Sequence, residues 1–318
     1  MKSLIVYCII IVSLLAFTGC TEETPTRYDV IPDDAVKMTP ETDIYAPIMH
    51  SEEWQQPIPM LGPINTAGAE DAPVISQDGK TFLFFFTPDV SVPPEKQVLD
   101  KVTGIWWCTN ENGVWTEPQK AVLSNSLALD GPLCFHDNLL WFCSVRQGNY
   151  REIDIYTAVL ENGEWKNWQN VGYQLNVEYL VGELYTTSDG STMIYHSNRN
   201  GTFGGNDMWL IEKNNGVWSP PVNLGPTINT EQDEGWPYLS ADGNELWFNR
   251  WSSMGYTGPA LYRTTRLENG SWSEPVEMVS NFAGDPAMDS EGNLYFTHHY
   301  YSDEMEMIEA DIYVCYKN

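Results

Sequence analysis

Carboxylates recur at a fixed place along this 318-residue chain, six to eight positions before a tight Asp-Gly-type turn. The members of this set are Glu70, Asp71, Asp130, Glu183, Glu234 and Asp285. If the segments that carry them converge, such side chains can bind a cation, gather basic groups, or act as general acid and base. The alternative is structural, because an acid at such a position also accepts backbone N–H hydrogen bonds from its own loop.

Aromatic and basic side chains accompany the acid at position 234. Trp236 follows Glu234 closely, and Arg250-Trp251 comes after the next expected strand. An exposed tryptophan can stack on a sugar and a guanidinium can grip a carboxylate, whereas core packing and pairing with a local acid are the structural alternatives. The candidate ligand-binding residues are therefore Glu70, Asp71, Asp130, Glu183, Glu234, Trp236, Arg250, Trp251 and Asp285.

The histidines form no metal-ligand pattern. His298 and His299 are adjacent, and on a strand they would point to opposite faces. We therefore predict no metal site and no cofactor, although a divalent cation at the carboxylates is an open alternative.

Two markers repeat along the chain with one period and show what positions these residues. Asn-Gly-x-Trp occurs at Trp115, Trp165, Trp218 and Trp272, at intervals of 50, 53 and 54 residues. Asp-Gly-type turns begin at Asp78, Asp137, Asp189, Asp242 and Glu291. Each unit contains four short apolar segments joined by turns whose Gly and Asn residues suit tight hairpins. The chain is therefore predicted to be all-β, with one four-stranded propeller blade per unit.

The count of blades follows from a mismatch between the markers. Five Asp-Gly-type turns are accompanied by only four Asn-Gly-x-Trp strands, and the chain stops after the third strand of the last unit. Residues 54–65 match residues 218–229, which include a fourth strand. We therefore expect a five-bladed β-propeller over residues 45–318, closed by an N-terminal strand that completes the last blade beside residues 311–316.

Several segments resemble a known family. Ser197-Asn198-Arg199, Gly204 to Trp209, the strand of Trp218 and Asp233 to Gly243 are similar to the WD40-like repeats of exported prokaryotic propellers, a group related to the propeller of the Tol-system periplasmic protein. The resemblance covers about residues 45–318 and is weaker in the first unit. It implies binding or scaffolding and carries no catalytic set.

A glycoside hydrolase or lyase is the alternative function. Asp71-Ala72-Pro73 and Asp130-Gly131-Pro132 resemble short motifs of furanose-cleaving five-bladed propellers. In this interpretation Asp71, Asp130 and Glu234 are the catalytic candidates. Hydrolysis requires two carboxyl groups about 5–9.5 Å apart, one of them held protonated.

The N-terminus carries an export signal. Lys2, the apolar run from Leu4 to Phe17, and Phe17-Thr18-Gly19-Cys20 resemble a lipoprotein signal peptide of residues 1–20, with Cys20 as the lipid attachment point. The alternative is an ordinary signal peptide. Residues 21–44 are rich in Thr, Glu, Pro and Asp, which predicts a flexible tether.

The formal charge of −28 makes nucleic-acid binding improbable and favours cations or basic partners. Cys108, Cys134, Cys143 and Cys315 lie in apolar segments, so buried free thiols are favoured, with a disulfide as the alternative. We therefore predict an exported, lipid-anchored, monomeric propeller of the cell envelope. It would bind a protein or glycan without catalysis and would contact the membrane only through its anchor.

Overall fold

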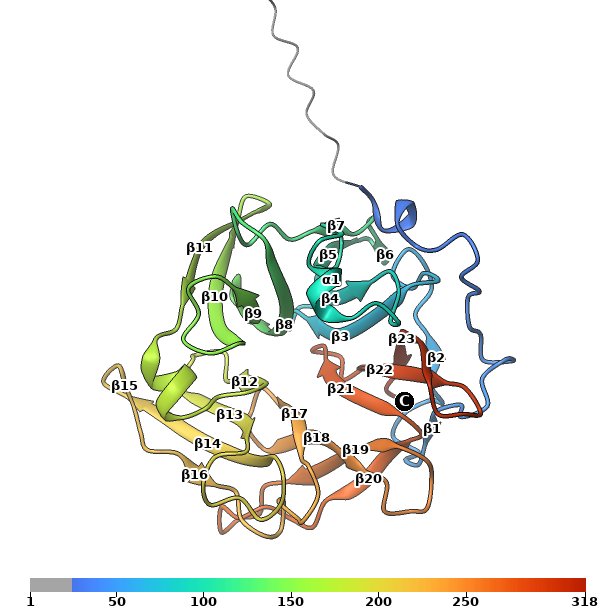
Figure 1. Cartoon of the computed structure of the whole chain (residues 1–318). Coiled ribbons are helices and arrows are strands. Elements are labelled where there is room, and N and C mark those ends of the chain that lie inside the picture. The colour runs from blue at the N-terminus through green and yellow to red at the C-terminus, as the bar shows by residue number, and fades with distance from the viewer. Residues whose placement is uncertain (1–24) are drawn as a thin grey trace, which may run out of the picture.

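The computed structural model describes residues 25–318, so the predicted signal peptide and Cys20 lie outside the described residues. Five antiparallel sheets surround a common axis (Figure 1). The protein is a five-bladed β-propeller, and this prediction from the repeats is confirmed. None of the helices in the described part of the chain is long and apolar enough to cross a membrane.

The strands follow the predicted order within each blade. Blade one contains β3 (Ala69–Ile75), β4 (Thr81–Thr87), β5 (Gly104–Glu111), β6 (Val114–Trp115) and β7 (Gln119–Lys120), and blade two contains β8 (Ala128–His136), β9 (Leu139–Arg146), β10 (Asp154–Glu161) and β11 (Glu164–Asn170). Blade three contains β12 (Leu184–Thr186), β13 (Thr192–Ser197), β14 (Asp207–Asn214), β15 (Val217–Trp218) and β16 (Val222–Asn223), and blade four contains β17 (Gly235–Leu239), β18 (Glu245–Trp251), β19 (Pro259–Thr265) and β20 (Val276–Ser280). Blade five contains β21 (Ala283–Met288), β22 (Leu294–Tyr301) and β23 (Met307–Cys315). Short helical turns occur at η1 (Arg27–Asp29), α1 (Pro94–Gln97) and η2 (Gln174–Glu178).

The second strand of a blade is apolar on both faces because neighbouring blades cover both sides. In β4, Phe82 and Phe84 pack into the cluster between blades one and five, whereas Leu83 packs into the cluster between blades one and two. All three side chains are fully buried. This double burial explains why these segments read as continuous apolar runs rather than as alternating strands.

The N-terminal part of the chain adds outer strands to two blades. Strand β2 (Ile58–Pro59) pairs with β23 in the fifth sheet, with Ile58 opposite Val314. A second short strand, β1 (Ile48–Met49), pairs with β20 at the edge of blade four. Residues 54–65 thus supply the outer strand of the fifth sheet.

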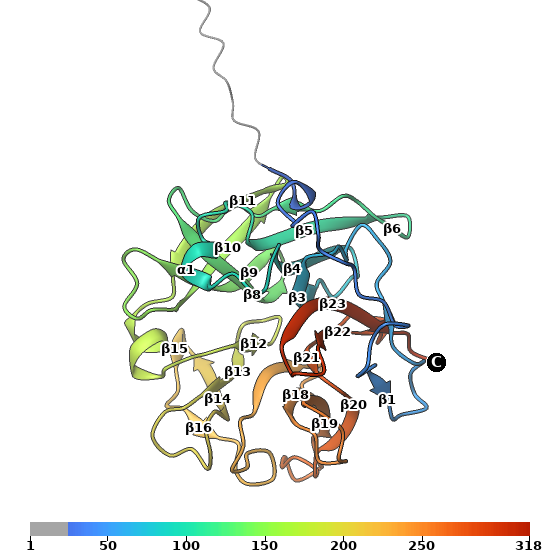
Figure 2. The same cartoon turned by 45° about the vertical axis from the view of Figure 1, so that its right-hand side comes forward.

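The expectation of a flexible tether is wrong for residues 25–44. This segment runs along the outside of blades one and five (Figures 1 and 2), where Arg27 is only 1% exposed and Met38 packs against a core cluster. Lys37 forms ion pairs with Glu309 and Asp311, and Asp43 with His298. Composition alone underestimated the segment's order because a few ion pairs to buried partners and a few apolar contacts, such as those of Val30 and Ile31, hold it in place.

The four cysteines in the described part of the chain are unpaired, which confirms the favoured interpretation of their thiols. Cys108, Cys134 and Cys315 are buried, whereas Cys143 is partly exposed.

Candidate functional site

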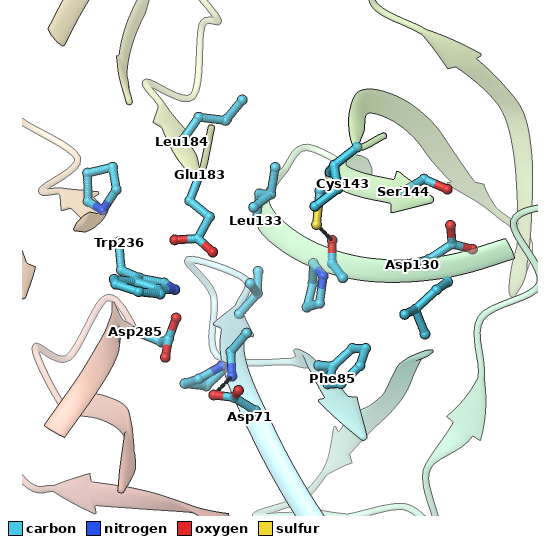
Figure 3. Close-up of a pocket in the computed structure, with 18 of the residues that line it drawn as sticks. Asp71, Phe85, Asp130, Leu133, Cys143, Ser144, Glu183, Leu184, Trp236 and Asp285 are labelled. Atoms are coloured by element: carbon cyan, nitrogen blue, oxygen red, sulfur yellow. Dashed lines mark hydrogen bonds between the residues drawn. The ribbon is translucent and has the colours of Figure 1, made fainter. Parts of the chain in front are cut away.

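The first strands of the five blades surround the axis and enclose a cavity of about 290 Å³ at one end of it. Acids and one tryptophan line this cavity together with a set of prolines (Figure 3). The polar and aromatic lining residues are Asp71, Asp130, Glu183, Trp236 and Asp285, and the prolines are Pro73, Pro132, Pro237 and Pro286. Five of the nine predicted ligand-binding residues are therefore brought together.

Bulges in the innermost strands aim side chains at the cavity. The residue before the proline has a left-handed backbone in three blades, with φ of 48° at Ala72, 50° at Trp236 and 52° at Asp285. The strand pairing shifts register at the same three places. A bulge of this kind reorients the side chain that it carries, at a cost of about 1–3 kcal/mol for a non-glycine residue.

Asp71 is held ionised within this cavity. Burial opposes ionisation, but His299, with its Nε2 3.7 Å from Asp71 Oδ1, and hydrogen bonds from Thr297 and the Ala72 N–H lower the pKa of Asp71 to about 2. The same contact with Asp71 outweighs burial and raises the pKa of His299. Asp71 and the protonated His299 therefore form an ion pair.

The pKa values of the other two axial acids, Glu183 and Asp285, are raised. Burial and the nearby Asp71 charge raise the pKa of Glu183 to about 8, against a hydrogen bond from Trp236. Burial, Asp71 and Glu183 likewise raise the pKa of Asp285, whose protonated form donates a hydrogen bond to Asp71. Asp71 is therefore ionised and Glu183 mainly protonated near neutral pH, and the pKa of Asp285 beside them is raised.

His196 lies behind Glu183. Its Nδ1 is 3.5 Å from Glu183 Oε2, and both atoms are buried without a hydrogen-bond partner in the described structure. Burial lowers the pKa of His196 to about 4, so the imidazole is neutral. Gly182 leaves room for the ring, because a Cβ there would be 2.4 Å from it.

Glu70 and Glu234 do not line the cavity, which corrects their predicted role. Each is fully buried and accepts hydrogen bonds from the backbone N–H and hydroxyl of the threonine four residues earlier, Thr66 or Thr230. They lie one residue further from the proline than Asp71 does, so alternation along the strand turns them away from the axis. For these two acids the loop-capping interpretation is correct.

Arg250 and Trp251 also lie outside the cavity lining. Arg250 contacts Glu234 at 3.7 Å, and Trp251 is 55% exposed elsewhere on the surface. In blade two, Arg146 pairs with Asp130 at 2.7 Å. The arginine after a second strand thus pairs with the acid that precedes the first strand, rather than with a ligand.

No protein-family model and no curated protein matches the chain. Among solved structures it is similar to TolB from Acinetobacter baumannii, with a TM-score of 0.46 and 14% identity over 79% of this chain and 55% of that one. It is also similar to a xylan beta-1,4-xylosidase from Bacillus halodurans (0.48, 14%, 80% and 54%) and an alpha-L-arabinofuranosidase from Lactobacillus brevis (0.45, 12%, 80% and 92%). The chain spans about half the length of the first two. Propellers of the TolB kind, which the repeats resemble, are thus among its structural neighbours, and none of these similarities bears on function.

Sequence reasoning did not assign His196 or His299 to the site. His298 and His299 do point to opposite faces, toward Asp43 and Asp71 respectively. The alternation argument excluded a shared metal but gave no reason to place one of them beside an acid from blade one. Among residues 25–318, no three His, Cys, Asp or Glu side chains are grouped so as to hold a metal ion.

Proposed function

We propose that the protein is a noncatalytic binding propeller that holds its ligand in the central cavity. The observation that carries this proposal is the convergence of Asp71, Glu183, Trp236 and Asp285, from four different blades, on one cavity. Its volume of about 290 Å³ is near the lower limit of ligand pockets, about 300 Å³. The left-handed conformation of Trp236 supports a role in binding, because strained residues cluster at functional sites.

We further propose that the protein is exported and attached to the cell envelope through a lipid on Cys20. The apolar run and the Phe-Thr-Gly-Cys sequence support this localisation. Only residues 21–24 separate Cys20 from the part of the chain that the structure describes. Metabolic labelling with a fatty-acid analogue tests it, with loss of label expected in Cys20→Ser.

Titration of the protein with a panel of short peptides and oligosaccharides tests binding. We expect Trp236→Ala to weaken binding of any ligand that binds by at least about tenfold, as for an aromatic anchor that the ligand covers. Trp251→Ala is the matched control, since Trp251 is exposed away from the cavity. Equal losses in both variants would contradict the cavity as the binding site.

A glycoside hydrolase or lyase is the second candidate. One observation favours it: Asp71 is ionised and Glu183 protonated across the same cavity, which is the division of roles that a base and an acid need. Glu183 replaces Glu234 as the acid candidate. Release of reducing sugar or of an unsaturated product from an oligosaccharide panel, abolished by Glu183→Gln, would establish catalysis and overturn the noncatalytic proposal.

A further inference from the structure

The cavity has two chemically different ends. Its axial end carries the carboxyl groups of Asp71, Glu183 and Asp285 and the Trp236 ring (Figure 3). Its other end reaches outward between blades one and two, because Phe85 of β4 and Val145 of β9 line it although both belong to second strands. A ligand that fills both ends must combine an apolar part with a group that suits carboxyl oxygens.

Two of the three axial carboxyl groups, those of Glu183 and Asp285, lack a cationic partner in the described structure. His299 faces Asp71, and Arg146 faces Asp130 toward the outer end. In the described structure no Lys or Arg forms an ion pair with Glu183 or Asp285. In addition, the buried Oε2 atom of Glu183 faces His196 Nδ1 at 3.5 Å without a hydrogen bond, so the protein leaves this carboxyl group incompletely satisfied.

We infer that the cavity takes a primary ammonium group on an apolar stem, as in a lysine side chain presented by a protein partner. This inference rests on the proposed binding function and names its ligand class. The ammonium would donate to Glu183 and Asp285 beside the Trp236 ring, while the methylene stem would lie along Phe85 and Val145.

The net charge of the molecule also favours a basic partner. The formal net charge of −28 attracts cationic segments at long range and raises their rate of encounter. Val145 and Ile153, at the outer end of the cavity, are 39% and 47% exposed and can pack against the chain that carries the lysine. A neutral sugar would use the carboxyl groups but would leave this apolar outer end without a matching surface.

Binding of an ammonium group should also change the protonation state of Glu183. Glu183 is protonated near neutral pH because burial and Asp71 raise its pKa to about 8. The groups that face it are Asp71, Asp285, the Cys143 thiol, neutral His196 and the Trp236 N–H. A bound cation favours the ionised carboxylate, so binding should release protons and strengthen as the pH rises toward 8.

The test uses two capped pentapeptides, one with a single lysine flanked by Gly and Ser and one with Nε-acetyl-lysine in its place, titrated into the full propeller by calorimetry. We expect the lysine peptide to bind at least about tenfold more tightly, because acetylation removes the charge. Glu183→Gln combined with Asp285→Asn should remove this preference. The control is Glu164→Gln combined with Glu161→Gln, which also removes two acids but at the exposed turn between β10 and β11, where Glu164 is 71% exposed.

The possible outcomes distinguish failure of the proposed ligand class from failure of the proposed binding function. Equal binding of the two peptides, with loss in Trp236→Ala, would overturn the cationic ligand but leave the binding cavity intact. Binding of neutral oligosaccharides alone would overturn it in favour of a glycan. If neither peptide nor any oligosaccharide bound at millimolar concentration, the proposed function would fail together with the inference.

Discussion

Two pairs of carboxyl groups in this propeller differ in what faces them. Glu70 and Glu234, in equivalent loops of blades one and four, are each paired with an arginine, whereas Glu183 and Asp285 in the cavity have none. The first pair is built for stability, since every acceptor has a donor. The second is left incomplete, and we attribute the difference to ligand binding.

Glu70 and Glu234 differ in the part of the chain that supplies their arginine. Arg250 reaches Glu234 from the same blade, but blade one has no arginine at that place, and Arg27 from the N-terminal segment pairs with Glu70 at 3.0 Å instead. Arg27 also donates to the carbonyl of Ile64, as Arg250 does to that of Ile228. Blade one is therefore completed by a residue that precedes the propeller repeats.

The largest expected effect is that of Arg27→Ala. It removes the hydrogen bonds that Arg27 donates to the buried carboxyl group of Glu70 and the carbonyl of Ile64, and we expect the free energy of unfolding to fall by about 2–5 kcal/mol. Arg250→Ala should cost less, because Arg250 is 12% exposed and its contact with Glu234 is longer, at 3.7 Å. Denaturant unfolding of both variants measures this, and similar losses would show that the N-terminal arginine has no special role.

A smaller effect is expected for Glu183→Gln, which should stabilise the protein relative to the wild type at high pH. Folding raises the pKa of this acid from 4.5 to about 8, so the folded state holds a proton that the unfolded chain has lost, and stability falls as the pH rises between these values. The variant should lose less stability over this window, by about 1–2 kcal/mol rather than the roughly 4 kcal/mol that the full shift would give, because the Glu183 side chain is 31% exposed and solvent screens it. Unfolding of the wild type, Glu183→Gln and the exposed control Glu164→Gln at pH 5 and pH 8 checks this. An unchanged pH dependence would mean that Glu183 is ionised in the folded state.

The smallest effect concerns the backbone of the cavity rim. Trp236→Gly should be more stable than Trp236→Ala by about 1 kcal/mol, because the position has a left-handed φ of 50° that glycine adopts without strain. Both variants lose the indole, so the difference isolates the strain. If alanine were as stable as glycine, the bulge would relax on substitution and the argument from strain would fail.

The architecture could be predicted from the sequence because it repeats, whereas the site could not because it breaks the repeat. The Asp-Gly turns and aromatic strands gave the five blades, and the match between residues 54–65 and 218–229 placed Ile58 beside β23. The carboxylates looked equivalent in sequence, yet a shift of one residue relative to the proline decides whether an acid faces the cavity, as for Asp71, or the loop, as for Glu70. The contribution of His299 depends on a contact between neighbouring blades, five and one, whose residues lie far apart in the sequence, so no local pattern contains it.

The pairing of Ile58 with Val314 also constrains how the protein is made. The two partners are separated by almost the whole chain, so the fifth sheet cannot assemble on the ribosome before synthesis is nearly complete. A contact of such long range closes slowly because the loop between its ends must first lose its freedom. The nascent polypeptide therefore keeps an unfinished ring for as long as its C-terminal strand is missing.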